Sequence, residues 1–336
     1  MTIEEIEAAI KASRPMPTVD VVRARMEFPF VTVLYPLGFP VEISSNSEIV
    51  LRIANESWGA FEQRFDTPPI CIQIGIIGDG MAEQPPVPVC RVQQHLFSFV
   101  ADEENYGLID MIQGFCCIWL THAAIKDRSY LRHFYLECAI VCPIATRFTT
   151  GVHAGCVSRD GVGVLLCGDS GAGKSTLSYA CAKAGWTYIT DDASYIVHGD
   201  ADLRVVGNCH QVRFRPAAGA FFPEIECGEV TQRAGTGKPS IELSPRALNI
   251  SFAQSANVKY LVILNRREGF NASLRPYSKD VVRRFLLQGR FSPLEMMPAH
   301  YAAIEQLLER EVFELRYTNL NWAIERLDAL VARGTR

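Results

Sequence analysis

The distribution of hydrophobic residues between residues 27 and 147 predicts strands separated by turns. Short apolar stretches alternate with Gly, Pro, Asn and Asp, the residue types that tight turns require. A mostly apolar helix is expected over 128–145, and residues 3–12 fit a short amphipathic helix that ends before Pro15 and Pro17. The strands expected in this β-rich region are 28–37, 48–54, 69–78 and 114–122.

After about residue 150, strand-like and helix-like segments alternate, which is the pattern of an α/β sheet covered by helices. The expected strands are 161–168, 186–190, 193–198, 203–208, 260–265 and 312–317. The expected helices are 174–184, 279–289, 298–310 and 319–333. We therefore predict an N-terminal helix and linker over 1–26, a β-rich α+β domain over 27–147, and an α/β domain over 148–336.

Composition and charge narrow the class of protein. The chain has 336 residues, of which 48% are hydrophobic and 21% charged, and its net charge is -4. It shows no concentrated basic surface, so we expect no nucleic-acid partner. It has no apolar run of about 18 residues, so we expect no membrane span. The N-terminus lacks the apolar core of a signal peptide, which predicts a cytoplasmic protein whose eleven cysteines are free thiols.

One motif indicates a specific chemistry. The residues GDSGAGKS at 168–175 satisfy the P-loop (Walker A) pattern G-x-x-x-x-G-K-[ST], with an apolar strand before them and a helix after them. Glycines let backbone N–H groups approach phosphate oxygens, and the start of a helix favours negative charge. Lys174 would reach the β- and γ-phosphates, and the Ser175 hydroxyl would ligate Mg²⁺.

The alternative is a glycine-rich turn without a ligand, but the full match and its context favour nucleotide binding. The predicted nucleotide-binding residues are Gly168, Asp169, Ser170, Gly171, Ala172, Gly173, Lys174, Ser175 and Thr176.

Two adjacent carboxylates follow the strand at 186–190. In P-loop proteins an Asp at the end of a neighbouring strand supports Mg²⁺, and a second carboxylate can accept a proton from an attacking hydroxyl. We expect Asp191 to be the base and Asp192 to lie on the metal side, with Ser175. Adjacent strand residues point to opposite faces, so the strand pattern must break for both to face one site. An acidic turn without chemistry is the alternative.

Two arginines are further candidates for phosphate contacts. Arg213 and Arg215 alternate in the sequence HQVRFRP, so a strand would present both on one face. Guanidinium groups suit phosphate because they donate two parallel hydrogen bonds. A solvated or ion-paired strand face explains the same pattern equally well.

The stretch HAGCVSRDGVGVLLCGDSGAGKSTLSYACAKAGWTYITDD, residues 153–192, resembles the catalytic core of HPr kinase/phosphorylase. The resemblance implies the P-loop kinase fold that this family shares with phosphoenolpyruvate carboxykinases. It also implies that His153 lies near the phosphate. The Asp pair would then bind metal and move a proton to and from a serine hydroxyl. In that family Glu follows the P-loop Ser, where this chain has Thr176.

Taken together, the sequence predicts an ATP-dependent kinase that uses Mg²⁺ and acts on a hydroxyl. Asp191, Asp192, His153 and Lys174 are the expected catalytic residues. The acceptor is either a seryl residue of a small protein or peptide, or a small metabolite. The alternative from another class is a nucleotide-dependent switch or NTPase without phosphoryl transfer. No N/T-K-x-D element that reads guanine is present, which favours ATP over GTP, and the chain is compatible with a homo-oligomer.

Overall fold

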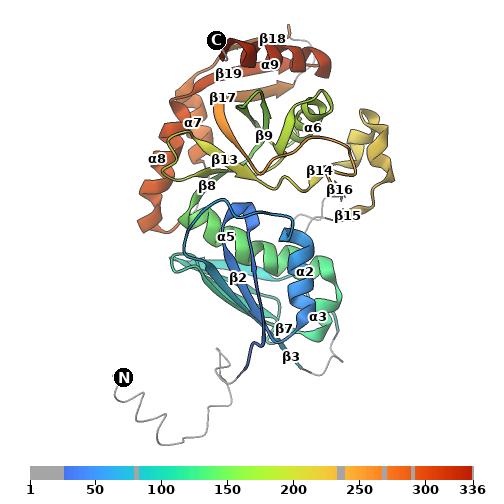
Figure 1. Ribbon diagram of the computed structural model, residues 1–336, viewed down its shortest axis with the longest axis vertical. Helices are drawn as coiled ribbons and strands as arrows, with labels where there is room; N and C mark the ends of the chain where they lie inside the picture. The colour runs from blue at the N-terminus through green and yellow to red at the C-terminus, as the bar shows by residue number, and fades with distance from the viewer. Residues whose placement is uncertain (1–25, 79–82, 233–238, 267–270, 289–291, 335–336) are drawn as a thin grey trace, which may run out of the picture.

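The computed structural model describes residues 26–78, 83–232, 239–266, 271–288 and 292–334. The helix predicted over 3–12 lies outside the described residues. The described chain is a mixed α/β structure in which several sheets are packed against helices (Figure 1).

The first part of the described chain forms the lower half of the molecule in Figure 1. Its elements are β1 (Phe30–Leu34), η1 (Pro36–Gly38), β2 (Val41–Ser45), α2 (Glu48–Trp58), β3 (Ile70–Ile77), β4 (Val89–Gln93), β5 (Leu96–Val100), β6 (Tyr106–Asp110), β7 (Phe115–Thr121), α3 (His122–Lys126), α4 (Arg128–Tyr130), η2 (Leu131–Leu136) and α5 (Glu137–Arg147).

The second part forms the upper half. Its elements are β8 (Thr149–Val152), β9 (Ala154–Arg159), β10 (Val162–Cys167), α6 (Lys174–Lys183), β11 (Thr187–Thr190), β12 (Ser194–Val197), β13 (Arg204–Gly207), β14 (Val212–Phe214), η3 (Pro216–Ala220), η4 (Pro223–Cys227), β15 (Val230–Gln232), β16 (Pro239–Leu243), β17 (Ser255–Arg266), β18 (Ser273–Pro276), α7 (Lys279–Leu287), η5 (Leu294–Met296), α8 (Met297–Leu308), β19 (Glu311–Tyr317) and α9 (Leu320–Gly334).

The first part is built on one mixed seven-stranded sheet. The strand order is β1-β2-β3-β7-β6-β5-β4, in which β2, β3 and β7 run parallel and the other pairs are antiparallel. Helices α2 and α5 pack on it and share a core with β2, β3 and β7. The helix predicted over 128–145 is confirmed as the continuous helical run α4, η2 and α5.

The strand predicted over 48–54 is wrong, because residues 48–58 form helix α2. Val50, Ile53, Ala54 and Trp58 are buried, and their spacing of three and four residues is that of one helix face. The seven residues of the predicted strand are too few to separate this spacing from a strand pattern, so the longer period becomes clear only when Trp58 is included.

The second part is built on a nine-stranded sheet with helices on both faces. Its central strands β10 and β17 are parallel, and β17 also pairs in parallel with β19. Helices α6 and α9 share a core with one face, and α7 and α8 share a core with the other. Because both faces are covered, all six residues of β10 are buried, which explains why this strand is a continuous apolar run in the sequence.

A shared core joins the two parts. Helix α5 ends at Arg147 and β8 begins at Thr149, close to the boundary that the sequence predicts. Val197, Val206 and Cys209 from the second part pack into the core of the first. The division into separate domains therefore stays a prediction.

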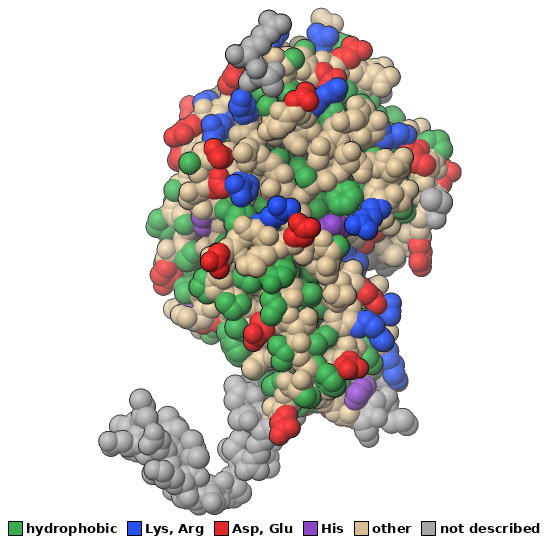
Figure 2. Space-filling view, viewed as in Figure 1, with side chains coloured by type: hydrophobic (Ala, Val, Ile, Leu, Met, Phe, Trp, Pro, Cys, Tyr) green, Lys and Arg blue, Asp and Glu red, His purple; other side chains and the backbone are tan. Residues whose placement is uncertain are grey.

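The surface in Figure 2 carries positive and negative side chains interspersed, and hydrophobic side chains gather over the lower half of this face. Within the described residues, no helix combines the length and apolar character needed to cross a bilayer. Every cysteine whose side chain is described is a free thiol, as the sequence predicts.

Candidate functional site

The loop at Gly168–Gly173 connects the end of β10 to the start of α6, as expected from the sequence. Gly171 and Gly173 have φ of +91° and +96°, a backbone conformation that residues with a Cβ rarely adopt. A Cβ at Gly173 would also lie 2.8 Å from Tyr317 Oη. No side chain among the described residues caps α6, so the N–H groups of its first turn are left for other partners.

Lys174, the first residue of α6, is folded back over this loop. Its Nζ donates hydrogen bonds to the carbonyl oxygens of Gly168 (2.7 Å) and Asp169 (3.0 Å). Burial lowers the pKa of Lys174, and the nearby carboxylates of Asp192 and Asp169 oppose this shift. An ammonium group has three donors, so the lysine closes the loop and keeps one donor for a further acceptor.

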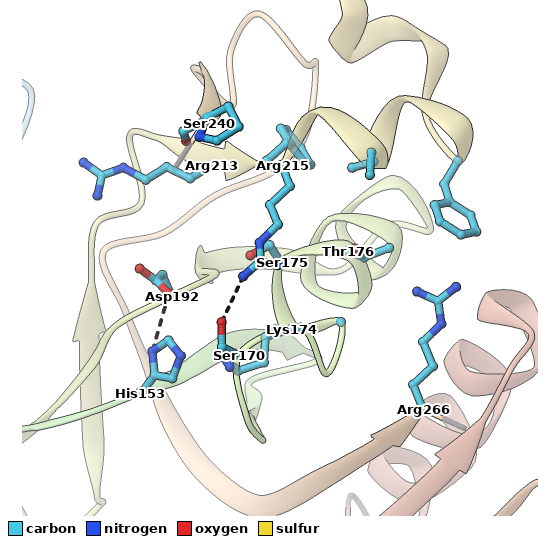
Figure 3. Close-up of a pocket in the computed structure, with 17 residues that line it drawn as sticks. His153, Ser170, Lys174, Ser175, Thr176, Asp192, Arg213, Arg215, Ser240 and Arg266 are labelled. Atoms are coloured by element: carbon cyan, nitrogen blue, oxygen red, sulfur yellow. Dashed lines mark hydrogen bonds and ion pairs between the residues drawn. The ribbon is translucent and has the colours of Figure 1, made fainter. Parts of the chain in front are cut away.

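A cavity of about 430 Å³ lies over the loop and the start of α6 (Figure 3). Its volume falls within the range of ordinary small-molecule sites. Most of its polar lining can donate hydrogen bonds or carries positive charge, and two cavity residues, His153 and Asp192, sit together at one end. The lining residues are His153, Ser170, Gly171, Gly173, Lys174, Ser175, Thr176, Asp192, Arg213, Phe214, Arg215, Ala217, Ala218, Phe221, Pro239, Ser240 and Arg266.

His153 and Asp192 form an ion-pair contact at the edge of this cavity. The distance from His153 Nδ1 to Asp192 Oδ1 is 3.4 Å, and the Asp192 side chain is 33% exposed. His153 stands between β8 and β9, and Asp192 follows β11, a direct neighbour of β9 in the sheet. The sheet thus brings together two residues that are 39 positions apart in the sequence.

Asp191 does not line this cavity. It is only 3% exposed, and the Tyr188 hydroxyl lies 2.8 Å from its Oδ1 and 2.8 Å from the Gln211 carbonyl oxygen. Burial raises the pKa of Asp191, although the hydroxyls of Ser175 and Tyr188 oppose this shift.

The arginines of the cavity have different partners. Arg213 forms ion pairs with Glu137 (3.3 Å) and Glu242 (2.9 Å). Arg215 donates to Ser170 Oγ at 2.9 Å, so it contacts the loop directly. Strand β14 ends before Arg215, yet both arginines line the cavity. Arg266, at the end of β17, lies 4.9 Å from the Phe221 ring centroid.

The described residues contain no group of three or more His, Cys, Asp or Glu side chains that could hold a metal ion by themselves. Mg²⁺ in phosphoryl-transfer sites needs only one or two protein ligands, because phosphates and water supply the rest. Asp191 Oδ2 is buried without a hydrogen-bond partner among the described residues, beside Ser175. A carboxylate and a hydroxyl at this position fit the ligand type that Mg²⁺ prefers.

Sequence reasoning did not single out Arg266 or Phe221. They come from the end of β17 and the residue after η3, far from the motif in the sequence. Arg266 reaches the cavity because β17 runs parallel to β10 and ends beside the loop. A pattern search within one segment cannot reveal that pairing. Thr176 lines the cavity as expected, whereas Ala172 packs against the core.

No protein-family model and no curated protein matches the chain. Among solved structures, the chain is similar to the Hpr(Ser) kinase/phosphatase from Coxiella burnetii, with 16% sequence identity and a TM-score of 0.30. The match covers 55% of this chain and 96% of the other. At this distance the likeness carries no functional argument, so we argue the function from the geometry of this chain.

Proposed function

We propose that the chain binds Mg·ATP in the cavity over the Gly168–Gly173 loop and transfers the γ-phosphoryl group to a hydroxyl acceptor. The observation that carries this proposal is the position of Asp192. It is a partly exposed carboxylate beside His153, and it lines the same cavity as Lys174 and the loop. A phosphate site with a carboxylate at its end is the arrangement that phosphoryl transfer to a hydroxyl requires.

The nucleotide's phosphates would lie across the loop and the first turn of α6. Among the described residues no side chain caps the N–H groups of that turn, and the cavity beside it is lined also by Lys174, Arg215 and Arg266. Positive groups there would stabilise the charge of the transferring phosphoryl group. Lys174 Nζ now contacts two loop carbonyls. A small rotation of its flexible side chain would bring the third donor to a phosphate oxygen.

Ser175 and Asp191 would hold the metal ion. Bound there, Mg²⁺ would neutralise negative charge that develops during phosphoryl transfer. The buried Oδ2 of Asp191 supplies a ligand that is held in place by the Tyr188 contact to Oδ1.

We therefore assign the two carboxylates in the order opposite to the one expected from the sequence. Asp192, which is accessible and paired with His153, would accept the proton from the acceptor hydroxyl. Asp191 is enclosed and borders the motif serine, which suits the metal side. His153 would hold the Asp192 carboxylate in position through the 3.4 Å contact.

The shape of the site favours a kinase over a nucleotide-dependent switch. A switch needs a site for nucleotide and metal but no access for a second substrate to the γ-phosphate. Here the Asp192 side chain faces the cavity, and Arg213, Arg215 and Arg266 also line the cavity. An acceptor can therefore approach the carboxylate that would deprotonate it.

The test compares Asp192→Asn with Asp191→Asn in two assays on the same folded preparations. Calorimetry measures Mg·ATP affinity, and transfer or slow hydrolysis of γ-labelled ATP measures turnover. Asp192→Asn should keep the affinity and lose about 10²- to 10⁴-fold in turnover, the size of general-base catalysis. Asp191→Asn should raise the Mg²⁺ concentration required. Wild-type turnover in both variants would refute the kinase mechanism.

A further inference from the structure

A second cavity lies on the other side of Asp192, between the two parts of the chain. It has a volume of about 100 Å³, compared with about 150 Å³ for an engineered cavity that binds benzene. Asp192 and Arg213 line both cavities. A ligand in the second cavity would therefore meet the same carboxylate that borders the nucleotide cavity.

The lining of this cavity combines apolar walls with one unused buried donor. Leu37, Val141 and Tyr195 supply apolar surface. The Trp58 side chain also lines the cavity, is 3% exposed, and its Nε1–H has no hydrogen-bond partner in the described part of the chain. A buried donor without an acceptor is energetically unfavourable, so a ligand oxygen that accepts from Trp58 would relieve this cost.

Backbone strain is present at the same wall. Leu37 has φ +56° and ψ +15°, which lies in the left-handed region that is unfavourable for a residue with a Cβ. Such conformations occur often at ligand sites, where the surrounding structure holds them. Leu37 is buried and packs into the core of the first part, so its conformation fixes this side of the cavity.

The charges of the lining select against an anionic ligand. Three carboxyl groups line the cavity, those of Glu137, Asp191 and Asp192, against one guanidinium, that of Arg213. Arg213 is already engaged by Glu137 and by Glu242, which lies outside the lining. Glu137 has a second ion-pair partner outside the lining, Arg132, and Mg²⁺ held by Asp191 would offset that carboxylate. A carboxylate or phosphate in the cavity would therefore chiefly meet the Asp192 carboxylate, with the Arg213 guanidinium already engaged.

We propose that this cavity holds the phosphoryl acceptor, and that the acceptor is a small uncharged or cationic alcohol, such as a short polyol or an amino alcohol. The proposal rests on the ATP-dependent transfer proposed above and adds the class of substrate. A cavity of about 100 Å³ admits only a molecule of a few non-hydrogen atoms. A serine on the surface of a folded protein would have to enter between the two parts of the chain.

The transfer step follows from the shared carboxylate. The acceptor hydroxyl oxygen forms a bond to the γ-phosphorus, and its proton passes to the Asp192 carboxylate. The bond between the γ-phosphorus and the bridging oxygen to the β-phosphorus breaks, and ADP leaves. The products are a phosphate monoester of the alcohol, ADP and a proton released to solvent from Asp192.

The experiment supplies γ-labelled Mg·ATP and the full-length protein with separate acceptors. The defined probes are glycerol, ethanolamine, glyceric acid and a seryl peptide, and the dialysate and retentate of a cell extract are run beside them. We expect label in a phosphate monoester of glycerol or ethanolamine, or in the dialysate, and at least about tenfold less with glyceric acid, as expected for one unpaired buried charge.

Two variants connect that transfer to the cavity. Val141→Phe fills the cavity from α5 without changing charge and should abolish transfer while Mg·ATP affinity stays at the wild-type value. Val89→Phe, at an exposed position of β4, is the matched control and should change neither. Trp58→Phe keeps an aromatic side chain but removes the N–H donor, and it should raise the KM for the acceptor about tenfold with little change in kcat.

If calorimetry shows that Mg·ATP binds, three outcomes would refute the proposed acceptor cavity but not the proposed nucleotide site. They are label confined to the seryl peptide or the retentate, release of inorganic phosphate alone, and full transfer by a folded Val141→Phe variant. Absence of Mg·ATP binding in the wild-type protein would instead refute the proposed function itself. If Val141→Phe does not fold, Trp58→Phe decides the role of the cavity.

Discussion

Replacing Gly171 with alanine separates the ligand-binding role of the loop from its backbone conformation, because the chain offers a matched control. Gly171 has φ +91° and Gly185, just after α6, has φ +90°. A Cβ built at either position meets no atom within 4 Å. Both substitutions therefore have the same steric consequence in the unliganded chain, which is backbone strain alone.

The expected loss of stability follows from two opposing terms. A residue with a Cβ in the left-handed region costs about 1–2 kcal/mol. Replacing glycine also lowers the entropy of the unfolded chain, which returns about 0.4–1 kcal/mol. We expect Gly171→Ala and Gly185→Ala each to lower the free energy of unfolding by about 1 kcal/mol, as measured by urea denaturation.

The two variants should differ in nucleotide affinity. Gly171 lines the nucleotide cavity, so a methyl group there would hold phosphate oxygens away from the loop N–H groups. The loss of one charge-assisted hydrogen bond, about 1.5–3 kcal/mol, weakens Mg·ATP binding by about 10- to 100-fold. Gly185→Ala should bind like the wild type in the same calorimetric titration. Equal affinity in both variants, or an equal loss, would refute the idea that the loop holds the phosphates.

Further predictions concern the lysine, the metal and the contact between the two parts. Lys174→Ala should weaken Mg·ATP binding by about 2–3 kcal/mol in calorimetry, and unchanged affinity would remove the lysine from the site. Ser175→Ala should raise the Mg²⁺ concentration needed at fixed ATP more than it weakens metal-free nucleotide binding; an equal loss would make Ser175 structural. Burial raises the pKa of Glu137, but His133 and Arg213 outweigh burial and leave that pKa below its usual value. The stabilisation that the ionised Glu137 carboxylate provides is therefore complete at pH values above the pKa of Glu137 in the unfolded chain. This stabilisation is lost as the pH falls through the pKa of Glu137 in the folded chain. Glu137→Gln should cost about 2 kcal/mol at pH 7, and the difference from wild type in urea denaturation should shrink below pH 4.5, the ordinary value for glutamate; a difference that is constant with pH would contradict this ion pairing.

Much of the second part could be predicted because its strands have two covered faces. The run Val162–Cys167 is apolar throughout, and the residues beyond it contain the glycines and lysine of the motif. The sequence therefore predicts both the strand and the loop. The motif is local, which is why a single segment is enough to place Lys174 and Ser175 at the start of α6.

Other features depend on distant pairing and could not be predicted from the sequence. Arg266 lines the cavity over the Gly168–Gly173 loop because β17 lies beside β10 in the sheet. Trp58 enters the second cavity because α2 of the first part packs near the residues that follow β11. Neither residue carries a local signal, since a tryptophan on an apolar helix face is ordinarily part of a core.

The divergence of Asp191 and Asp192 explains how two neighbouring carboxylates can have different tasks. Strand β11 has a register shift between Tyr188 and Thr190 and ends at Thr190. In the bend that follows, Asp191 contacts Tyr188, whereas Asp192 contacts His153. Asp192 lines two cavities, the one proposed for the nucleotide and the one proposed for the acceptor. A base must reach the acceptor hydroxyl as the acceptor approaches the γ-phosphorus from the side opposite the leaving group.

A nucleotide-dependent switch does not need the second cavity, because it binds no phosphoryl acceptor. The second cavity, rather than the phosphate loop that both classes share, is therefore the feature by which a kinase can be distinguished from a switch in this chain.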